Sequence, residues 1–450
     1  MRKSIVWLTA AALLVACEKK QEQEKPAEPE AAPAAPAPAA GEAAEAGEPA
    51  KADDPALKLL DAAIEARGGL EKAEAVEGWT ASTRGVYMGG PYQAVNHYTP
   101  GTMRMDVLDP AGEPAMKMLF SLDDCWSQIG KVLIPCTEQT KDEYRTMMAM
   151  DQAFLLYPLK EAGWKLEAGE QEVEGTTYKT LQVEHAGTDA KGTLFFDPES
   201  HQLVRMSYQG SMMGKPTSFV TTYTDYKETC GIQLPGASET TADGKPYVTE
   251  TCTEVTCGAP APEVFRQPEQ VADGTCEIKK TPPMTLACVK HKGPYQNMGK
   301  AFEKLTASMQ KQGMMPMGPA VMTYLKAPPR VKNPKKLVTE VCFPVAAKAP
   351  RRPAKKAGLV IKGVKARDVL AIYGVGDYQE KSSEMARNIM KEAKKRKLRP
   401  RGPVCQISYM EPGKLPVEQM VSEMQIPVKA GKGMKGKRVR KGKRAGKGTR

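Results

Sequence analysis

Two glutamates occupy matching places in a repeated part of the sequence. Glu340 lies in the segment TEVCFPV, and Glu423 lies in SEMQIPV, 83 residues further along the chain. Side chains alternate between the two faces of a strand, so the apolar residues of each segment point one way and the glutamate points the other. A carboxylate in such a position can bind a cationic or polar group through charge. The sequence therefore predicts a ligand site with two equivalent carboxylates.

Four tyrosines accompany these glutamates at related positions. Tyr295 and Tyr378 are 83 residues apart, and Tyr324 and Tyr409 lie near the ends of the neighbouring strand segments. Aromatic rings beside a carboxylate favour cationic or planar ligands, through apolar contact and the cation–π attraction. We therefore predict that the four tyrosines line the site together with the two glutamates. The alternative for the glutamates is a solvated or salt-bridged face of a sheet.

The repeat that contains these residues spans residues 274–428. Other matches at the same separation of 83 residues are Gly293 with Gly376 and Val345 with Val428. Each copy reads as a strand, a helix and two further strands. Two such copies side by side are expected to form one antiparallel sheet with both helices on one face. The opposite face is then a groove.

The repeat resembles the GyrI-like effector-binding domain of AraC- and MerR-type multidrug regulators and of stand-alone gyrase-inhibitor proteins. The segments that carry the resemblance are HKGPY, GPAVMTY and TEVCFPV in the first copy and SEMQIPV in the second. The resemblance implies a small-molecule site with a ligand-contacting glutamate on the last strand, which is Glu423 here. In regulators a DNA-binding module precedes this domain. This sequence has an export signal and a β-rich region instead, so we expect no DNA partner.

Residues 55–270 are expected to form a separate β-rich domain. Helical spacing predicts a helix in DPALKLLDAAIEARGG and another near residues 141–159, among many short strand-like segments. The segments GTLFFDPESHQLVRM and YTDYKETCGIQLP resemble the LolA/LolB-like half-barrel superfamily. The resemblance implies an open apolar concavity able to hold acyl chains, and the alternative is an ordinary filled core.

The fold class predicted for the whole chain is therefore α+β. It consists of a curved antiparallel half-barrel-like domain with helices, followed by a duplicated β-α-β-β domain of the GyrI-like type.

The first seventeen residues read as an export signal. Two basic residues precede an apolar run from Ser4 to Ala16, which is too short to span a membrane as a helix. The run ends in Leu-Val-Ala-Cys, which resembles the lipobox of bacterial lipoproteins. The resemblance implies a diacylated Cys17, and Glu18 favours the outer membrane by analogy with the sorting rule of enteric bacteria. The alternatives are an ordinary cleaved signal and an apolar core segment.

Both ends of the chain have compositions typical of disorder. Residues 18–54 are rich in Ala, Pro and Glu and are predicted to be an extended tether. Residues 429–450 contain eleven Lys or Arg and no acid, so that the formal net charge of +12 falls to +1 without them. In an exported protein such a tail favours anionic envelope polymers or lipid headgroups as partners. The alternative is a solubilising tail without a specific partner.

Nine cysteines remain beside Cys17. Cys125 and Cys136 flank a short hairpin-like stretch and could form a disulfide, which export permits. Further bridges could come from a cluster that consists of Cys230, Cys252, Cys257 and Cys276. An odd number leaves at least one thiol without an internal disulfide partner. No Cys/His pairs have zinc-ligand spacing, so we expect no metal and no cofactor.

The leading hypothesis from these features is a binding protein. It would be a lipid-anchored envelope protein that captures a small amphipathic or cationic molecule in its groove, for instance to sequester it. A second hypothesis is a hydrolase of strained electrophilic small molecules that uses Glu423 with Tyr409 or Tyr378. A third is a structural lipoprotein that docks to the envelope. An enzyme is less favoured, since the sequence has no Ser-His-Asp, HExxH or P-loop pattern.

Overall fold

The computed structural model describes residues 54–109, 112–212, 214–314, 316–328, 330–345, 354–356, 358–410 and 415–430. The predicted lipidation site Cys17, the export signal, the tether up to residue 53 and the basic tail from residue 431 lie outside these residues. The described chain divides into two compact units. The first comprises residues 54–127 and 136–267, and the second comprises residues 128–135 and 268–430. No described helix has the length and apolar character needed to cross a membrane.

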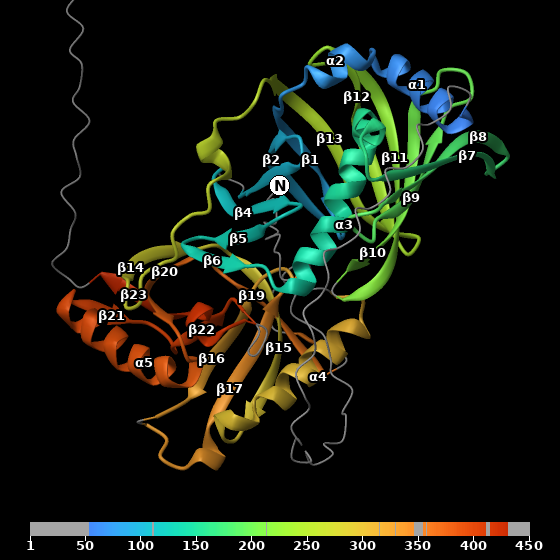
Figure 1. Ribbon diagram of the computed structural model, residues 1–450. Coiled ribbons are helices and arrows are strands. Elements are labelled where there is room, and N and C mark those ends of the chain that lie inside the picture. The colour runs from blue at the N-terminus through green and yellow to red at the C-terminus, as the bar shows by residue number, and fades with distance from the viewer. Residues whose placement is uncertain are drawn as a thin grey trace, which may run out of the picture. The chain divides into compact units, whose positions relative to one another are not determined.

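The larger sheet has thirteen antiparallel strands in the order β6-β5-β4-β3-β2-β1-β13-β12-β11-β10-β9-β8-β7 (Figure 1). Its strands are β1 (Trp79–Tyr87), β2 (Gly90–Thr99), β3 (Thr102–Leu108), β4 (Pro114–Ser121), β5 (Cys125–Ile129), β6 (Val132–Pro135), β7 (Trp164–Val173), β8 (Thr176–His185), β9 (Lys191–Phe196), β10 (Leu203–Met212), β11 (Lys215–Thr229), β12 (Ile232–Ala242) and β13 (Lys245–Cys257). Almost every neighbour in the sheet is also a neighbour in the sequence, as in a meander, and β6 and β7 remain as open edges.

Helices pack on one face of this sheet. They are α1 (Pro55–Arg67), α2 (Leu70–Glu74) and α3 (Glu138–Leu155). Asp54 caps the start of α1, and Gly68, with φ of 125°, ends it. Leu60 of α1 and Met150 of α3 belong to the same buried cluster as Phe196 of β9. The predicted helices are confirmed, and the apolar face over β8, β9 and β10 is packed with helical side chains.

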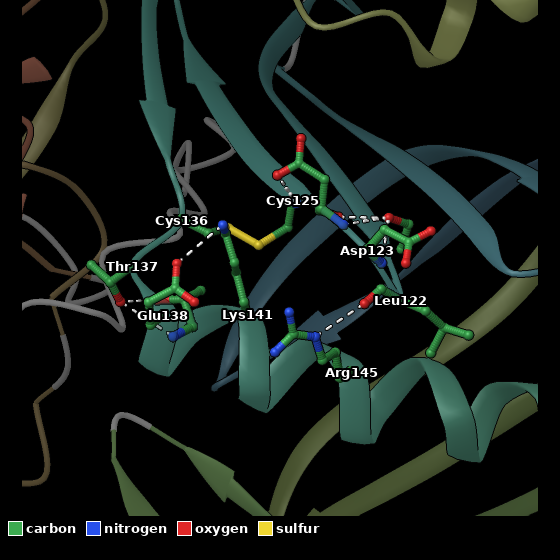
Figure 2. The surroundings of a disulfide bond; sticks show 11 residues. Leu122, Asp123, Cys125, Cys136, Thr137, Glu138, Lys141 and Arg145 are labelled. Carbon is green, nitrogen blue, oxygen red and sulfur yellow. Dashed lines mark hydrogen bonds and ion pairs between the residues drawn. A yellow bond between two sulfur atoms is a disulfide. The ribbon is translucent and has the colours of Figure 1, made fainter. Parts of the chain in front are cut away.

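A disulfide closes the base of the β5–β6 hairpin. Cys125 and Cys136 are bonded, as the sequence predicted (Figure 2). Thr137 follows directly as the N-cap of α3, and its hydroxyl accepts a hydrogen bond from the Thr140 N–H at 3.2 Å. Arg145 of α3 donates to the Leu122 carbonyl at 3.1 Å, just before β5. Helix α3 thus holds the chain on both sides of the hairpin.

Replacing Thr137 with Ala is expected to lower the free energy of unfolding by about 1 kcal/mol, because an N–H at the start of α3 loses its acceptor. Thr137→Ser keeps the hydroxyl and is the matched control. Urea unfolding of both variants measures the difference, and equal stability of the Ala and Ser variants would contradict the capping role.

The second unit contains a ten-stranded sheet in the order β14-β20-β23-β22-β16-β17-β15-β19-β18. Its strands are β14 (Cys276–Thr281), β15 (Met284–Lys292), β16 (Ala320–Lys326), β17 (Val338–Pro344), β18 (Ala354–Lys356), β19 (Leu359–Val364), β20 (Arg367–Val375), β22 (Cys405–Ser408) and β23 (Val421–Ala430), and a short strand β21 (Leu398–Pro400) pairs with β23. Helices α4 (Gly299–Gln310) and α5 (Tyr378–Lys395) complete the unit (Figure 1). The predicted α+β class is confirmed.

Each copy of the repeat has one more strand than the predicted β-α-β-β. Strand β14 precedes β15 in the first copy but pairs with β20 of the second, and β19 precedes β20 but pairs with β15. Lys279 lies opposite Val369, and Lys362 lies opposite Leu286. Both of these pairs are related by the same 83-residue offset. The two copies therefore exchange their first strands.

Two further disulfides lie elsewhere in the described chain. Cys230 is bonded to Cys257, which is one of the bridges that the sequence left open. Cys288 is bonded to Cys342, a pair that the sequence reasoning missed because 54 residues separate them. They lie directly opposite each other on β15 and β17. Free thiols among the described cysteines are Cys252, Cys276 and Cys405.

Candidate functional site

The last strand of each copy presents its glutamate away from the helices. On β23, Met424 and Ile426 are buried in the cluster that contains Met385 of α5. On β17, Val341 and Phe343 are buried in the cluster that contains Leu305 of α4. Since neighbouring residues of a strand point to opposite faces, Glu423 and Glu340 lie on the face opposite the helices, as predicted.

The Glu423 carboxylate is completely buried and surrounded by donors. The Lys279 ammonium of β14 lies 2.8 Å from each carboxylate oxygen. The Tyr409 hydroxyl donates to Oε2 at 2.5 Å, and the Gln425 amide donates to Oε1 at 2.7 Å. Glu423 is 0% exposed, so these contacts replace water entirely. The exchanged strand β14 thus supplies the cation that balances this charge.

Tyr373 of β20 connects this buried pair to an outer carboxylate. Lys279 donates to the Tyr373 hydroxyl at 3.0 Å, and Tyr373 donates to Glu277 Oε1 at 2.7 Å. The Glu277 side chain is 23% exposed, whereas Glu423 is enclosed. The five side chains form one hydrogen-bonded network, which we call the Glu423 network. Its members are Glu277, Lys279, Tyr373, Tyr409 and Glu423.

The tyrosines of the Glu423 network are hydrogen-bond donors at neutral pH. Burial, reinforced by the Glu423 charge, raises the pKa of Tyr373 and of Tyr409 far above the usual value. Burial acts to raise the pKa of Glu277, but hydrogen bonds from Lys131 and Tyr373 outweigh it, and that pKa is lowered. Glu277 is therefore an ionised, partly exposed carboxylate at the outer end of the network.

The first copy is different at the equivalent place. Glu340 is paired with Lys362 in the same exchanged geometry. The equivalents of Ala371 and Gln425, at the 83-residue offset, are Cys288 and Cys342, which form the disulfide. The side chains around this disulfide are aliphatic or thioether groups: Met284, Leu286, Val321, Val360 and Val364. The first copy therefore has no equivalent of the tyrosine–carboxylate network.

Cys288, Glu340 and Cys342 bring three metal-binding atom types together. In this structure the disulfide takes up both sulfur atoms, so the group offers only one carboxylate. That carboxylate is already paired with Lys362. The expectation that the protein needs no metal stays a prediction.

Three of the four predicted tyrosines lie on the helical side of the sheet. Tyr324 shares its side of β16 with Met322, which packs under α4, and its hydroxyl donates to Gln406 at 2.6 Å. The Tyr295 ring contacts the Tyr324 ring, with centroids 5.5 Å apart. The Tyr378 hydroxyl contacts the Met322 sulfur at 3.0 Å. The structure therefore brings only Tyr409 together with Glu423.

Sequence reasoning missed Glu277, Lys279 and Tyr373 as members of the site. Lys279 and Lys362 match at the 83-residue offset, which is the one signal that singles them out. The segment CEIKKT that forms β14 is half charged and carries no alternating apolar pattern, so it does not read as a strand.

In the first unit the structure shows a pocket of another kind. It lies across β7, β8, β9 and β10, and its lining includes Lys165, Glu167 and Gln182. Ligand sites for acyl chains are lined mainly by apolar groups. This polar pocket is not the apolar concavity that the half-barrel resemblance implied.

Comparison with known proteins identifies the family of part of the chain. Residues 233–346 match the family described as the GyrI-like small molecule binding domain. The match includes the first copy of the repeat and confirms the resemblance found in the sequence. No curated protein is significantly similar to this chain.

Solved structures include matches to both parts of the protein. The C-terminal domain of EcmrR is 12% identical, with a TM-score of 0.31 over 35% of this chain and 98% of that one. A hydrolase from Listeria innocua is 14% identical, with a TM-score of 0.27 over 35% of this chain and 94% of that one. A LolA superfamily protein from Nitrosomonas europaea is 12% identical, with a TM-score of 0.35 over 47% of this chain and 97% of that one.

Proposed function

We propose that this protein binds a small amphipathic molecule on the sheet face that carries the Glu423 network. The observation that carries the proposal is the difference between the two copies. The second copy keeps a network of carboxylates, a lysine and tyrosines where the first has a disulfide and aliphatic side chains. The family match over the first copy supports the same activity, since that family is described as small-molecule binding.

The chemistry of the network favours a ligand with a polar or cationic group next to an apolar body. Glu277 is the outer carboxylate, and the rings of Tyr373 and Tyr409 belong to a buried apolar cluster with Met410, Met420 and Val421. A charge beside aromatic and thioether groups suits an ammonium or a planar polar group. Sequestration of such a molecule is the role that we propose.

The proposal is tested by native mass spectrometry of the full chain, purified from its own envelope in detergent. We expect a small molecule to remain bound to the wild type and to Glu340→Gln, and to be lost from Tyr373→Phe, which removes only the hydroxyl that links Lys279 to Glu277. Circular dichroism confirms that each variant is folded. Equal retention in all three proteins would sink the proposal.

The envelope location is a further part of the proposal and rests on the sequence before residue 18. We propose that Cys17 is diacylated and holds the protein on a membrane, the outer membrane by the Glu18 rule, because several acyl chains anchor a protein firmly. Mass analysis of the N-terminal peptide is expected to show the added acyl groups, and Cys17→Ser is expected to release the protein into the soluble fraction. An unmodified Cys17 in the membrane fraction would contradict the anchor.

A hydrolase of strained electrophiles is a second candidate, favoured by the contact between Tyr409 and Glu423. The two oxygens are 2.5 Å apart, and burial keeps Tyr409 protonated, as a general acid requires. Glu423 already receives hydrogen bonds from Lys279, Tyr409 and Gln425, which leaves it little capacity to attack a substrate. Turnover of styrene oxide that Glu423→Gln abolishes would favour the enzyme over the binding protein.

A further inference from the structure

The second compact unit includes residues 128–135, the tip of the β5–β6 hairpin. Val132 is 0% exposed and lies in the same apolar cluster as Tyr373 and Tyr409 of the Glu423 network. Ile129 and Ile134 pack against this cluster as partly buried side chains. The face that we propose as the ligand site is therefore in contact with a segment of the chain itself.

Polar contacts hold the tip in place. The Lys131 ammonium lies 2.7 Å from Glu277 Oε2. The Gln270 side chain accepts a hydrogen bond from the Leu133 N–H at 3.1 Å and donates one to the Leu133 carbonyl at 2.7 Å. The tip is thus bound by one ion pair, by one amide that imitates a neighbouring strand, and by the burial of Val132.

The partners of the two acidic side chains differ in how easily they can be exchanged. Glu423 is enclosed by donors from its own sheet and from the residue after β22, and none of them can leave without unfolding it. Glu277 is paired with Lys131, whose side chain is 55% exposed. Exposed ion pairs contribute little to stability, so a competing cation can replace Lys131.

Lys131 and Val132 together present an ammonium group beside an aliphatic body. That combination has the chemistry proposed for the ligand. We infer that the hairpin tip is a built-in occupant of the ligand site, and that a ligand replaces Lys131 at Glu277 and Val132 at the tyrosines. This inference rests on the proposed function and adds that the ligand is a monocation with an apolar body, which binds as the tip withdraws.

The first test needs no ligand. The full chain carrying Lys131→Ser and Val132→Ser is compared with the wild type by hydrogen exchange at the amides of residues 128–135. The Leu133 amide is expected to exchange about tenfold faster in the variant, since it keeps its bond to Gln270 but loses the anchors beside it. Lys191→Met, which removes an exposed ion pair with Glu184, is the control. Unchanged exchange in the double variant would overturn the anchoring role of these two side chains.

The second test uses dansylcadaverine, a fluorescent primary ammonium, with the uncharged N-butyl dansylamide for comparison. The double variant is expected to bind dansylcadaverine about tenfold more tightly than the wild type, because the internal competitor is gone. Glu277→Gln is expected to weaken binding of the cation about tenfold and to leave the uncharged compound unaffected. Saturating dansylcadaverine is expected to speed exchange at residues 128–135 of the wild type.

The outcomes separate the inference from the proposed function. Equal affinity in wild type and double variant, with unchanged exchange at residues 128–135 on saturation, overturns the occupant and leaves a binding protein. Binding to neither protein overturns the proposed function for cationic ligands, and with it the inference. Tighter binding to the variant together with ligand-induced exchange supports both.

Discussion

Lys279→Met is expected to lower the free energy of unfolding by about 3 kcal/mol, because it leaves a buried carboxylate without its cation. Glu423 is 0% exposed, and Lys279 contacts both of its oxygens at 2.8 Å. The hydrogen bonds from Tyr409 and Gln425 remain in the variant but carry no full positive charge. Removal of one partner of a buried pair costs more than removal of both, since only the first change leaves an isolated charge.

Urea unfolding at pH 7 measures the effect. The double variant Lys279→Met with Glu423→Gln is expected to recover most of the lost stability, because no isolated charge remains. Lys280→Met, at the next position on the same strand and exposed, is the matched control and is expected to change stability by less than about 0.5 kcal/mol. If Lys279→Met and Lys280→Met are equally stable, the pair does not have the role described here.

Asp151→Asn is expected to have an effect of similar size and opposite sign. Asp151 lies on α3, and burial raises the pKa of its carboxyl to about 6. At pH 7 the folded protein therefore holds an ionised group in a place that favours the neutral form. A shift of this size corresponds to at most about 3 kcal/mol of lost stability, and the neutral amide of Asn restores it.

The pH dependence gives this prediction its sign. Between pH 4 and pH 6 the folded state binds the Asp151 proton more tightly than the unfolded state, so stability falls as the pH rises through this window. The advantage of Asp151→Asn should thus be greatest above pH 6 and vanish below pH 4. Asp142→Asn, an exposed position of the same helix whose carboxylate pairs with Arg145, is the control. A pH-independent difference between wild type and Asp151→Asn would contradict the buried carboxyl.

Features that depend on neighbouring residues were predictable from the sequence. The alternation along TEVCFPV and SEMQIPV placed Glu340 and Glu423 opposite the helices, because a strand has a period of two residues. The apolar stripes of α4 and α5 follow from the helical period in the same way. The disulfide between Cys125 and Cys136 was accessible because only one hairpin separates the two cysteines.

The tyrosines show where local reasoning stops. Tyr324 and Tyr409 both follow a central strand of their copy, yet Tyr324 shares its face with Met322 while Tyr409 contacts Glu423. Tyr324 lies within β16, whose alternation fixes its side, and Tyr409 lies just after β22, where the strand has ended. The repeat therefore predicts equivalent positions but not equivalent directions once a strand ends.

The duplication, the α+β class and the face on which each glutamate lies follow from the chain alone, because periodicity and repetition are local properties of sequence. The partner of each glutamate does not. Lys279 reaches Glu423 from 144 residues away because the copies exchange their first strands, and Cys288 reaches Cys342 because β15 and β17 pair in one register. Such contacts join segments that are distant in sequence, and strand order and register, which only the folded sheet specifies, decide which of them meet.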